Sequence, residues 1–239
     1  MHRLRYGDEV IAFERLPRTS SRQRILIKVH PDCRVQVRAP DSASDADVLQ
    51  AVRKRAGWIS KRLQEFRKAS EFAATRRYVS GESHPYLGRN HLLKVLHAED
   101  AETVKLLRGR FEVRARDRNA ERVQKLLGDW YRSKAEDIFR QRLDALMQEV
   151  LWLREPPELG IRVMQTQWGS CSPKGRLTLN LHMVKAPRDC IDYVILHELC
   201  HLAEHNHSKR FYRLMKQVMP SWEEVKRLLD SRAAVILAT

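Results

Sequence analysis

The chain has 239 residues, 43% of them apolar, which is enough to bury a core in one large domain or two small ones. No apolar run approaches the ~18 residues of a membrane-spanning helix, and the N-terminal segment lacks the apolar stretch that a secretory signal needs. The composition therefore excludes an integral membrane protein and predicts a cytoplasmic location. Cys33, Cys171, Cys190 and Cys200 form no CxxC pair, so we expect reduced thiols rather than disulfides or a four-cysteine zinc site.

The formal net charge of +15 is concentrated in the first half of the chain. Residues 1–118 carry 26 Lys and Arg against 15 Asp and Glu, whereas residues 119–239 carry 19 against 15. Clustered cations contact phosphates without reading a base sequence, so the first half is a candidate surface for nucleic acid or another polyanion. The alternative is a solvated basic helix face. The clusters are Arg18/Arg22/Arg24, Arg53-Lys54-Arg55, Lys61-Arg62, Arg67-Lys68 and Arg76-Arg77.

Residues 1–118 have the pattern of a small β-rich module with one basic helix. Strands are predicted over 10–15 and 24–38, and the second range contains a hairpin turn at His30-Pro31-Asp32. Apolar residues recur at helical steps over 45–70, and the opposite face of this predicted helix is cationic. Further short strands are expected at Tyr78-Val79, Tyr86-Leu87-Gly88, 91–96, 103–107 and 110–113.

The pattern of residues 119–239 predicts a second domain, with a boundary between residues 118 and 119. The predicted fold class of the whole chain is α+β, and the sequence shows no internal repeat. A long helix is expected over 119–149, stopped by Pro156-Pro157. Two strands over 161–168 and 177–181 are expected to form a hairpin through 169–175. A helix is then expected to start at 187–189, where Asp189 can cap free amides and Asp192 adds negative charge to the first turn.

That last helix carries the most informative motif of the chain, His197-Glu198-Leu199-Cys200-His201. Two histidines four residues apart lie one turn above each other on one helix face, where both can bind one zinc ion. Glu198 lies beside them, placed to accept a proton from a water molecule at the metal. The motif therefore indicates metal-assisted hydrolysis. Cys200 projects away from the two histidines and is interpreted as a small buried hydrophobe.

A catalytic zinc site uses three protein ligands and leaves a fourth position for water, so a third ligand is needed. His207 is the favoured candidate, because Asn206 tolerates the left-handed conformation that ends helices and would let the chain turn back to the metal. His205 is its nearest rival, and Glu223 or Glu224 from a later helix is the other alternative. Glu204, one turn beyond the motif, is a candidate partner for a ligand.

Several stretches of the sequence resemble the YgjP-like metallopeptidases, which are related to the SprT-like and WLM zinc peptidases. In the C-terminal part they are Trp168-Gly169-Ser170-Cys171-Ser172, Leu179-Asn180, Ala186-Pro187, 191–201, and Asn206-His207-Ser208 with Phe211. In the N-terminal part they are Trp58-Ile59, Val79-Ser80-Gly81-Glu82 and Tyr86-Leu87-Gly88. The resemblance covers almost the whole chain.

The resemblance implies a minimal zincin core, with a β-hairpin sheet, an active-site helix and flanking helices. It implies that His197, His201 and His207 bind Zn²⁺, that Glu198 is the general base, and that a protein or peptide substrate pairs with the strand near 168–172. The oxyanion candidates are Tyr193, His182, His205 and Asn180. Two other hypotheses stay open: a non-catalytic, zinc-stabilised module that binds nucleic acid or protein, and a hydrolase of non-peptide amides.

Overall fold

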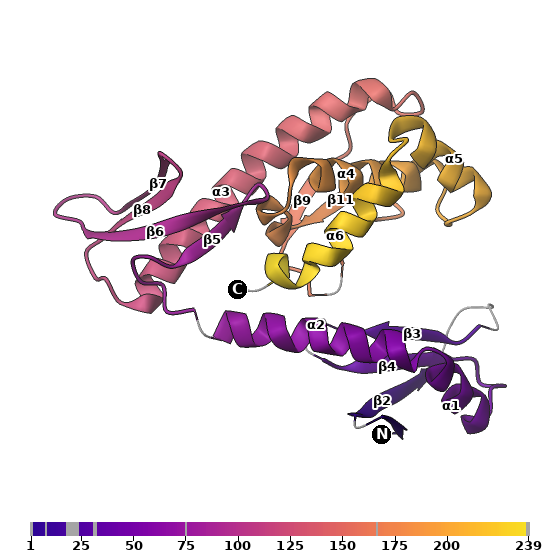
Figure 1. The fold of residues 1–239 in the computed structure, drawn as a ribbon. Helices are drawn as coiled ribbons and strands as arrows, with labels where there is room; N and C mark the ends of the chain where they lie inside the picture. The colour runs from indigo at the N-terminus through magenta and orange to yellow at the C-terminus, as the bar shows by residue number, and fades with distance from the viewer. Residues whose placement is uncertain are drawn as a thin grey trace. The chain divides into compact units, whose positions relative to one another are not determined.

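The computed structural model describes residues 2–7, 9–17, 24–30, 33–74, 76–165 and 167–237 (Figure 1). The chain divides into two compact units, Met1–Thr75 and Arg76–Leu237. Both units combine sheets with helices, so the predicted α+β class is confirmed. No helix among the described residues is long and apolar enough to cross a membrane, and the cytoplasmic location stays a prediction.

The first unit is a four-stranded sheet covered by two helices. Its strands and helices are β1 (His2–Tyr6), β2 (Glu9–Pro17), β3 (Leu26–Val29), β4 (Val35–Ala39), α1 (Asp45–Lys54) and α2 (Ala56–Ala74). The strand order is β1-β2-β4-β3, with β2 and β4 parallel and the outer pairs antiparallel. Alternate strand residues such as Phe13 and Val37 meet Val48, Val52 and Ile59 of the helices in one buried core.

The single helix predicted over 45–70 is two helices separated at Arg55. Ser44 caps α1 through a capping box with Asp47, and at Arg55 the main-chain N–H donates back to Val52, which ends that helix. The apolar period did not reveal the break, because Val52 at the end of α1 and Ala56 at the start of α2 face the same core.

Part of the predicted basic helix face is neutralised within the first unit. Arg67 forms an ion pair with Glu9 at 2.5 Å, and Arg62 pairs with Glu65 at 2.8 Å. Arg18, Arg22 and the side chain of Lys68 lie outside the described residues. Contact with nucleic acid stays a prediction that no described contact supports.

The second unit begins with another four-stranded sheet. Its strands are β5 (Ser83–Tyr86), β6 (Arg89–His97), β7 (Thr103–Leu107) and β8 (Arg110–Ala115), in the order β5-β6-β8-β7. As in the first unit, the central pair is parallel and the outer pairs are antiparallel, so the same topology occurs twice although the sequence shows no repeat. Tyr78-Val79 is not a strand, and Leu87-Gly88 is the turn between β5 and β6.

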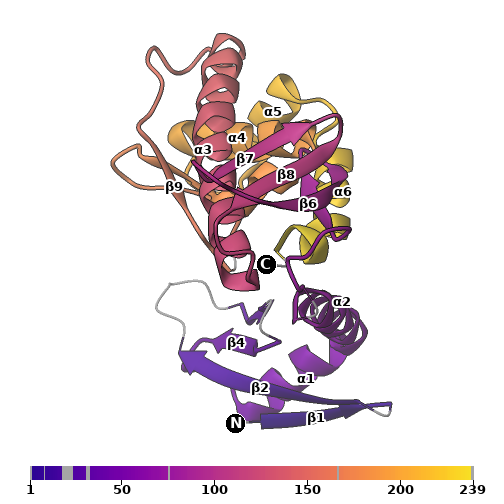
Figure 2. The same cartoon turned by 90° about the vertical axis from the view of Figure 1, so that its left-hand side faces the viewer.

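This second sheet belongs with the helix that follows it, α3 (Ala120–Leu146), as Figure 2 shows. Phe111 of β8 packs against Trp130 of α3 with 4.9 Å between the ring centroids, and Leu93 shares the same core. The boundary between the units therefore falls at residue 75, whereas the sequence placed it at 118. Strands 83–115 bury their apolar face against α3, so separating them from it would expose that face.

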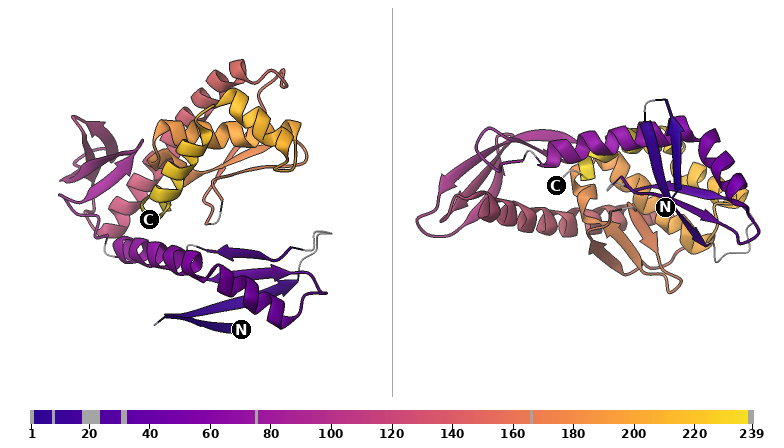
Figure 3. Two further views of the ribbon diagram at one scale, coloured as in Figure 1. Left: turned by 45° about the vertical axis from the view of Figure 1, so that its right-hand side comes forward. Right: turned by 90° about the horizontal axis from the view of Figure 1, so that it is seen from below.

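Helix α3 starts at Asn119, whose side chain accepts the N–H of Arg122, and ends at Leu146, followed by the 3-10 turn η1 (Met147–Glu149). It therefore stops well before Pro156-Pro157, so the proline pair does not end it. Its first half packs on the second sheet, and its second half packs on α4 (Arg188–Ala203) (Figure 3).

A small sheet of order β10-β11-β9 follows, made of β9 (Leu159–Arg162), β10 (Gly169–Cys171) and β11 (Leu177–Asn180). The antiparallel hairpin is β10 with β11, and β9 runs parallel to β11. The prediction of one hairpin strand over 161–168 is corrected: Ile161 and Arg162 belong to β9, which runs parallel to β11, and Asn180 binds the main chain of Met164 and Gln167 outside any strand.

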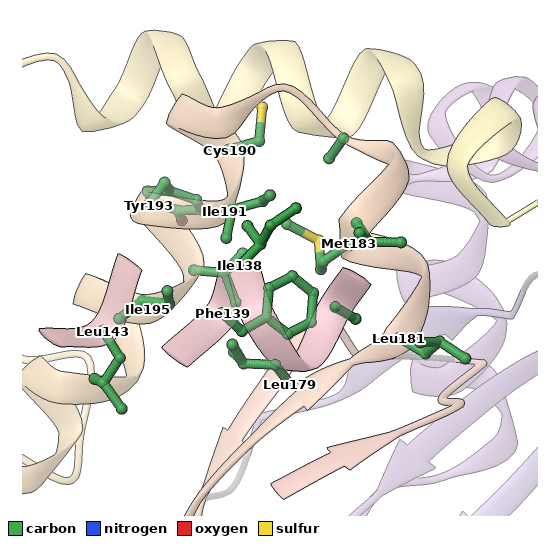
Figure 4. Packing of buried hydrophobic residues seen from close by; sticks show 14 of the residues in the cluster. Ile138, Phe139, Leu143, Leu179, Leu181, Met183, Cys190, Ile191, Tyr193 and Ile195 are labelled. Atoms are coloured by element: carbon green, nitrogen blue, oxygen red, sulfur yellow. The ribbon is translucent and has the colours of Figure 1, made fainter. Parts of the chain in front are cut away.

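The last elements are the 3-10 helix η2 (Leu181–Lys185), α4 (Arg188–Ala203), α5 (Lys209–Val218) and α6 (Trp222–Leu237). Phe139 of α3 lies at the centre of the core that α4 shares with β11 and η2 (Figure 4). Pro187, not Asp189, is the N-cap of α4, and its ring gives no side-chain hydrogen bond. Asp192 instead accepts two hydrogen bonds from Arg142 of α3, at 2.7 and 2.8 Å.

The turn at Leu87-Gly88 connects the second sheet to the start of α4. Gly88 has a φ of +78°, and its N–H donates to the carbonyl of Lys185. A Cβ at Gly88 would lie 2.9 Å from Cγ of Pro187 and 3.0 Å from its Cα. Both the backbone conformation and the space at this position therefore require glycine.

We expect Gly88→Ala to destabilise the protein by about 2 kcal/mol or more, because a left-handed alanine and a clash with Pro187 add up. Urea denaturation measures this. The control is Gly128→Ala in α3, where a Cβ meets nothing within 4 Å and a gain of up to about 1 kcal/mol is expected. Equal stability of Gly88→Ala and wild type would contradict the packing described.

Candidate metal centre

Helix α4 and the turn after it bring three histidines together. His197 and His201 are one turn apart, with 4.9 Å between their ring centroids. Glu204 takes extended backbone and ends α4, and Ser208 then caps α5 through the N–H groups of Arg210 and Phe211. His207 lies in this turn. Asn206 does not adopt the left-handed conformation that we expected; the extended Glu204 ends the helix instead.

The three histidine side chains can hold one metal ion. Each offers a ring nitrogen, and these nitrogens all lie within 4.8 Å of one another. The Nε2 atoms of His197 and His207 are 3.1 Å apart. Two nitrogens bound tetrahedrally at zinc distances are about 3.3 Å apart, so the spacing fits a shared ion.

The environment keeps these imidazoles neutral, which is the form that binds a metal. Burial lowers the pKa of His197 to about 3, with a further contribution from His201 and His207. Burial also lowers the pKa of His201 and that of His207. Nδ1 of His201 donates to the carbonyl oxygen of Glu204 at 3.2 Å, which leaves Nε2 for a metal. Glu204 thus acts on the cluster through its main chain.

The side chain of Phe211 packs against all three histidines, a contact that the sequence pattern did not predict. This side chain of α5 is fully buried. Its ring centroid lies 5.0 Å from that of His197 and 4.7 Å from those of His201 and His207. One aromatic side chain therefore limits the rotation of all three imidazoles.

Glu198 lines a cavity of about 180 Å³ beside His197. The carboxyl group is 6% exposed, and burial raises its pKa from 4.5 to about 7. A carboxylate of this basicity both accepts and returns a proton near neutral pH. The other residues that line the cavity are Gln167, Trp168, Gly169, Tyr193 and Val194.

Gly169 of β10 lets the strand approach Glu198 closely. A Cβ at this position would lie 2.8 Å from Oε1 of Glu198 and 2.9 Å from Cγ1 of Val194. Any side chain at residue 169 therefore displaces the carboxylate. The sequence placed this glycine in a loop, and no periodic pattern indicated its contact with α4.

Of the four oxyanion candidates, one lines the Glu198 cavity and three do not. The Asn180 amide is fully buried and binds the loop at Met164 and Gln167, so it is not free to contact an oxyanion. His182 lines a different cavity, and His205 is exposed outside the histidine cluster. Tyr193 does line the Glu198 cavity.

Glu223, Glu224 and Cys200 also lie outside the histidine cluster. Glu223 and Glu224 are exposed on α6 and do not join the three histidines. Cys200 is fully buried, and none of the four cysteines Cys33, Cys171, Cys190 and Cys200, all of them among the described residues, forms a disulfide.

A helix with two histidines and a glutamate, completed by a third histidine, has the side chains of a metal-dependent hydrolase. Comparison with family models identifies the class of hydrolase. The model described as YgjP-like, metallopeptidase domain, matches residues 23–232, so the chain belongs to the YgjP-like metallopeptidase family. Membership implies a metal ion and a peptidase activity.

Two solved structures are similar to part of the chain. One is the metallopeptidase zymogen of Pyrococcus abyssi abylysin, with 24% identity, a TM-score of 0.33, and coverage of 41% of this chain and 93% of that one. The other is the metallopeptidase zymogen of Methanocaldococcus jannaschii jannalysin, with 24% identity, a TM-score of 0.34, and coverage of 41% and 95%. The comparison with curated proteins gave no match.

We expect His207→Ala to lose most of its bound metal, because two imidazoles hold a divalent ion far more weakly than three. Elemental analysis after dialysis against a weak chelator measures metal per chain. The control is His205→Ala, which removes an exposed histidine two residues away and is expected to keep the wild-type content. Equal metal in the His207→Ala variant and wild type would rule out His207 as a ligand.

Proposed function

We propose that the protein is a zinc-dependent peptidase in which His197, His201 and His207 bind the ion and Glu198 is the general base. The observation that carries the proposal is the convergence of three histidine nitrogens within 4.8 Å at the edge of the cavity that Glu198 lines. Membership of a metallopeptidase family supports the same reading.

The donor set favours zinc over other common metals. Three neutral imidazoles suit Zn²⁺, whereas Mg²⁺ and Ca²⁺ prefer oxygen ligands. Three protein ligands are typical of catalytic zinc sites, and four of structural ones. When bound, the ion would supply Lewis acidity toward water and toward the substrate carbonyl.

Side chains of the protein then transfer the proton and hold the imidazoles in place. Glu198 accepts the proton of the attacking water as the new C–O bond forms. It returns this proton to the amide nitrogen as the C–N bond breaks, so one carboxyl group serves as base and then as acid. Its raised pKa suits both steps. Phe211 and the Glu204 carbonyl hold the imidazoles in place.

The strand β10 is the proposed binding edge for an extended peptide. In the order β10-β11-β9, one side of β10 pairs with β11 and the other side is the edge of the sheet. Gly169 at its start touches Glu198, so a peptide that extends this sheet runs past the carboxylate. The proposed substrate is accordingly a protein or peptide in extended conformation.

We expect Glu198→Gln to keep its metal and to lower kcat for peptide hydrolysis by about 10²–10⁴-fold, because the shape is kept and the base is removed. Casein cleavage or hydrolysis of a quenched peptide measures the rate, and elemental analysis measures the metal. The matched control is Glu223→Gln, an exposed glutamate expected to change neither. Full activity in Glu198→Gln would favour a non-catalytic binding module.

We also expect Gly169→Ala to retain its metal and lose activity, because the added methyl group pushes the carboxylate out of place without touching the histidines. The control is Gly160→Ala in β9, where the nearest atoms belong to the flexible side chain of Arg176 at 3.3 Å. A Gly169→Ala enzyme with wild-type kcat and metal content would contradict the role given to this close approach.

A further inference from the structure

A second cavity lies within the Arg76–Leu237 unit, formed by β5, α3, η2 and the segment before β5. Its volume is about 120 Å³, and none of its lining residues lines the Glu198 cavity. Four basic side chains contribute to its wall: Arg76, His84, His182 and Lys185. The other lining residues are mostly apolar and include Leu127, Tyr131, Leu181 and Val184.

Three of these four basic side chains are deeply buried. His84 is completely shielded from solvent, Lys185 is 5% exposed and His182 is 9% exposed. Among the described residues, neither ring nitrogen of His84 has a hydrogen-bond partner; Nε2 lies 3.6 Å from Oε2 of Glu82. Burying a polar group without a hydrogen bond is energetically unfavourable, and His84 lines the cavity in this state.

The charge of Arg76 affects the pKa values of the other basic groups at this site. Burial, followed by the charge of Arg76, lowers the pKa of Lys185 to about 7. Burial, together with the charges of Arg76 and Lys185, lowers the pKa of His84 to about 4 and that of His182 to about 3. Glu82 acts on His84 in the opposite sense. The Lys185 ammonium also lies 5.5 Å above the Tyr131 ring, a contact that itself favours a cation.

We infer that this cavity binds a small organic anion. Its carboxylate or phosphate head would lie among Lys185, Arg76 and His84, and its apolar body would lie on the wall that includes Leu127 and Tyr131. The head would provide acceptors for the free His84 nitrogens, and its charge would offset the repulsion between the two cations. The cavity volume limits the ligand to about the size of a single substituted ring.

Isothermal titration of the full-length, metal-loaded protein at constant ionic strength tests this inference. The probes are benzoate and phenyl phosphate, with benzamide as the uncharged analogue of benzoate. We expect saturable binding of at least one anion and at least about tenfold weaker binding of benzamide. The more tightly bound anion identifies the head group as carboxylate or phosphate.

Lys185→Met tests the site itself, because it keeps the length of the side chain and removes its charge. Affinity for the anion is expected to fall at least about tenfold. Lys216→Met, at an exposed position on α5, is the control and is expected to keep the wild-type affinity. If Lys185→Met does not fold, Arg76→Gln replaces it with the same expected loss of affinity.

Equal affinity for benzoate, phenyl phosphate and benzamide would overturn the inference. Unchanged anion affinity in both Lys185→Met and Arg76→Gln would overturn it as well. Because the inference does not depend on the metal centre, a positive titration with an inactive Glu198→Gln protein would support the anion site and leave the proposed peptidase function to its own tests.

Discussion

The second unit depends on the burial of helix α4 on nearly all of its sides. Nine of its sixteen residues are buried, and one of these is Glu198. Its start packs on Gly88, its middle is tied to α3 through Asp192 and Arg142, and its end is held where the indole N–H of Trp152 donates to the carbonyl of Leu199. The histidines lie on the remaining face of α4. The helix cannot shift without disturbing the core, so the positions of these side chains are fixed.

Burial also links the chemistry of the site to its stability. An ionised carboxylate at the position of Glu198 is costly in an apolar environment, and three imidazoles close together cannot all become protonated. A bound cation offsets the first cost and uses the neutral histidines that the second enforces. The same packing that makes α4 rigid therefore makes the site suited to a metal ion.

Local patterns in the sequence predicted those features of the structure that depend on residues close together in the chain. The four-residue spacing placed His197 and His201 on one helix face, and alternation located most strands. Contacts between distant segments could not be predicted in this way. Gly169 gives no signal of its approach to Glu198, and nothing local to Asn180 indicates that its side chain binds the main chain of Met164 and Gln167. The boundary at residue 75 likewise depends on packing between β8 and α3, which no local period records.

The described sheets differ in how their edge strands are protected against pairing with another chain. Lysine, arginine and proline discourage such pairing, and the edge strands β1, β3, β5, β7 and β9 each carry at least one of them: Arg3, Lys28, Pro85, Lys105 and Arg162. The edge strand β10, Gly169-Ser170-Cys171, carries none of these residues. Among the described edges, the unprotected one is therefore the edge that borders Glu198. If this edge binds an extended substrate as proposed, the distribution of charge on the strands would keep that substrate from pairing with the other edges.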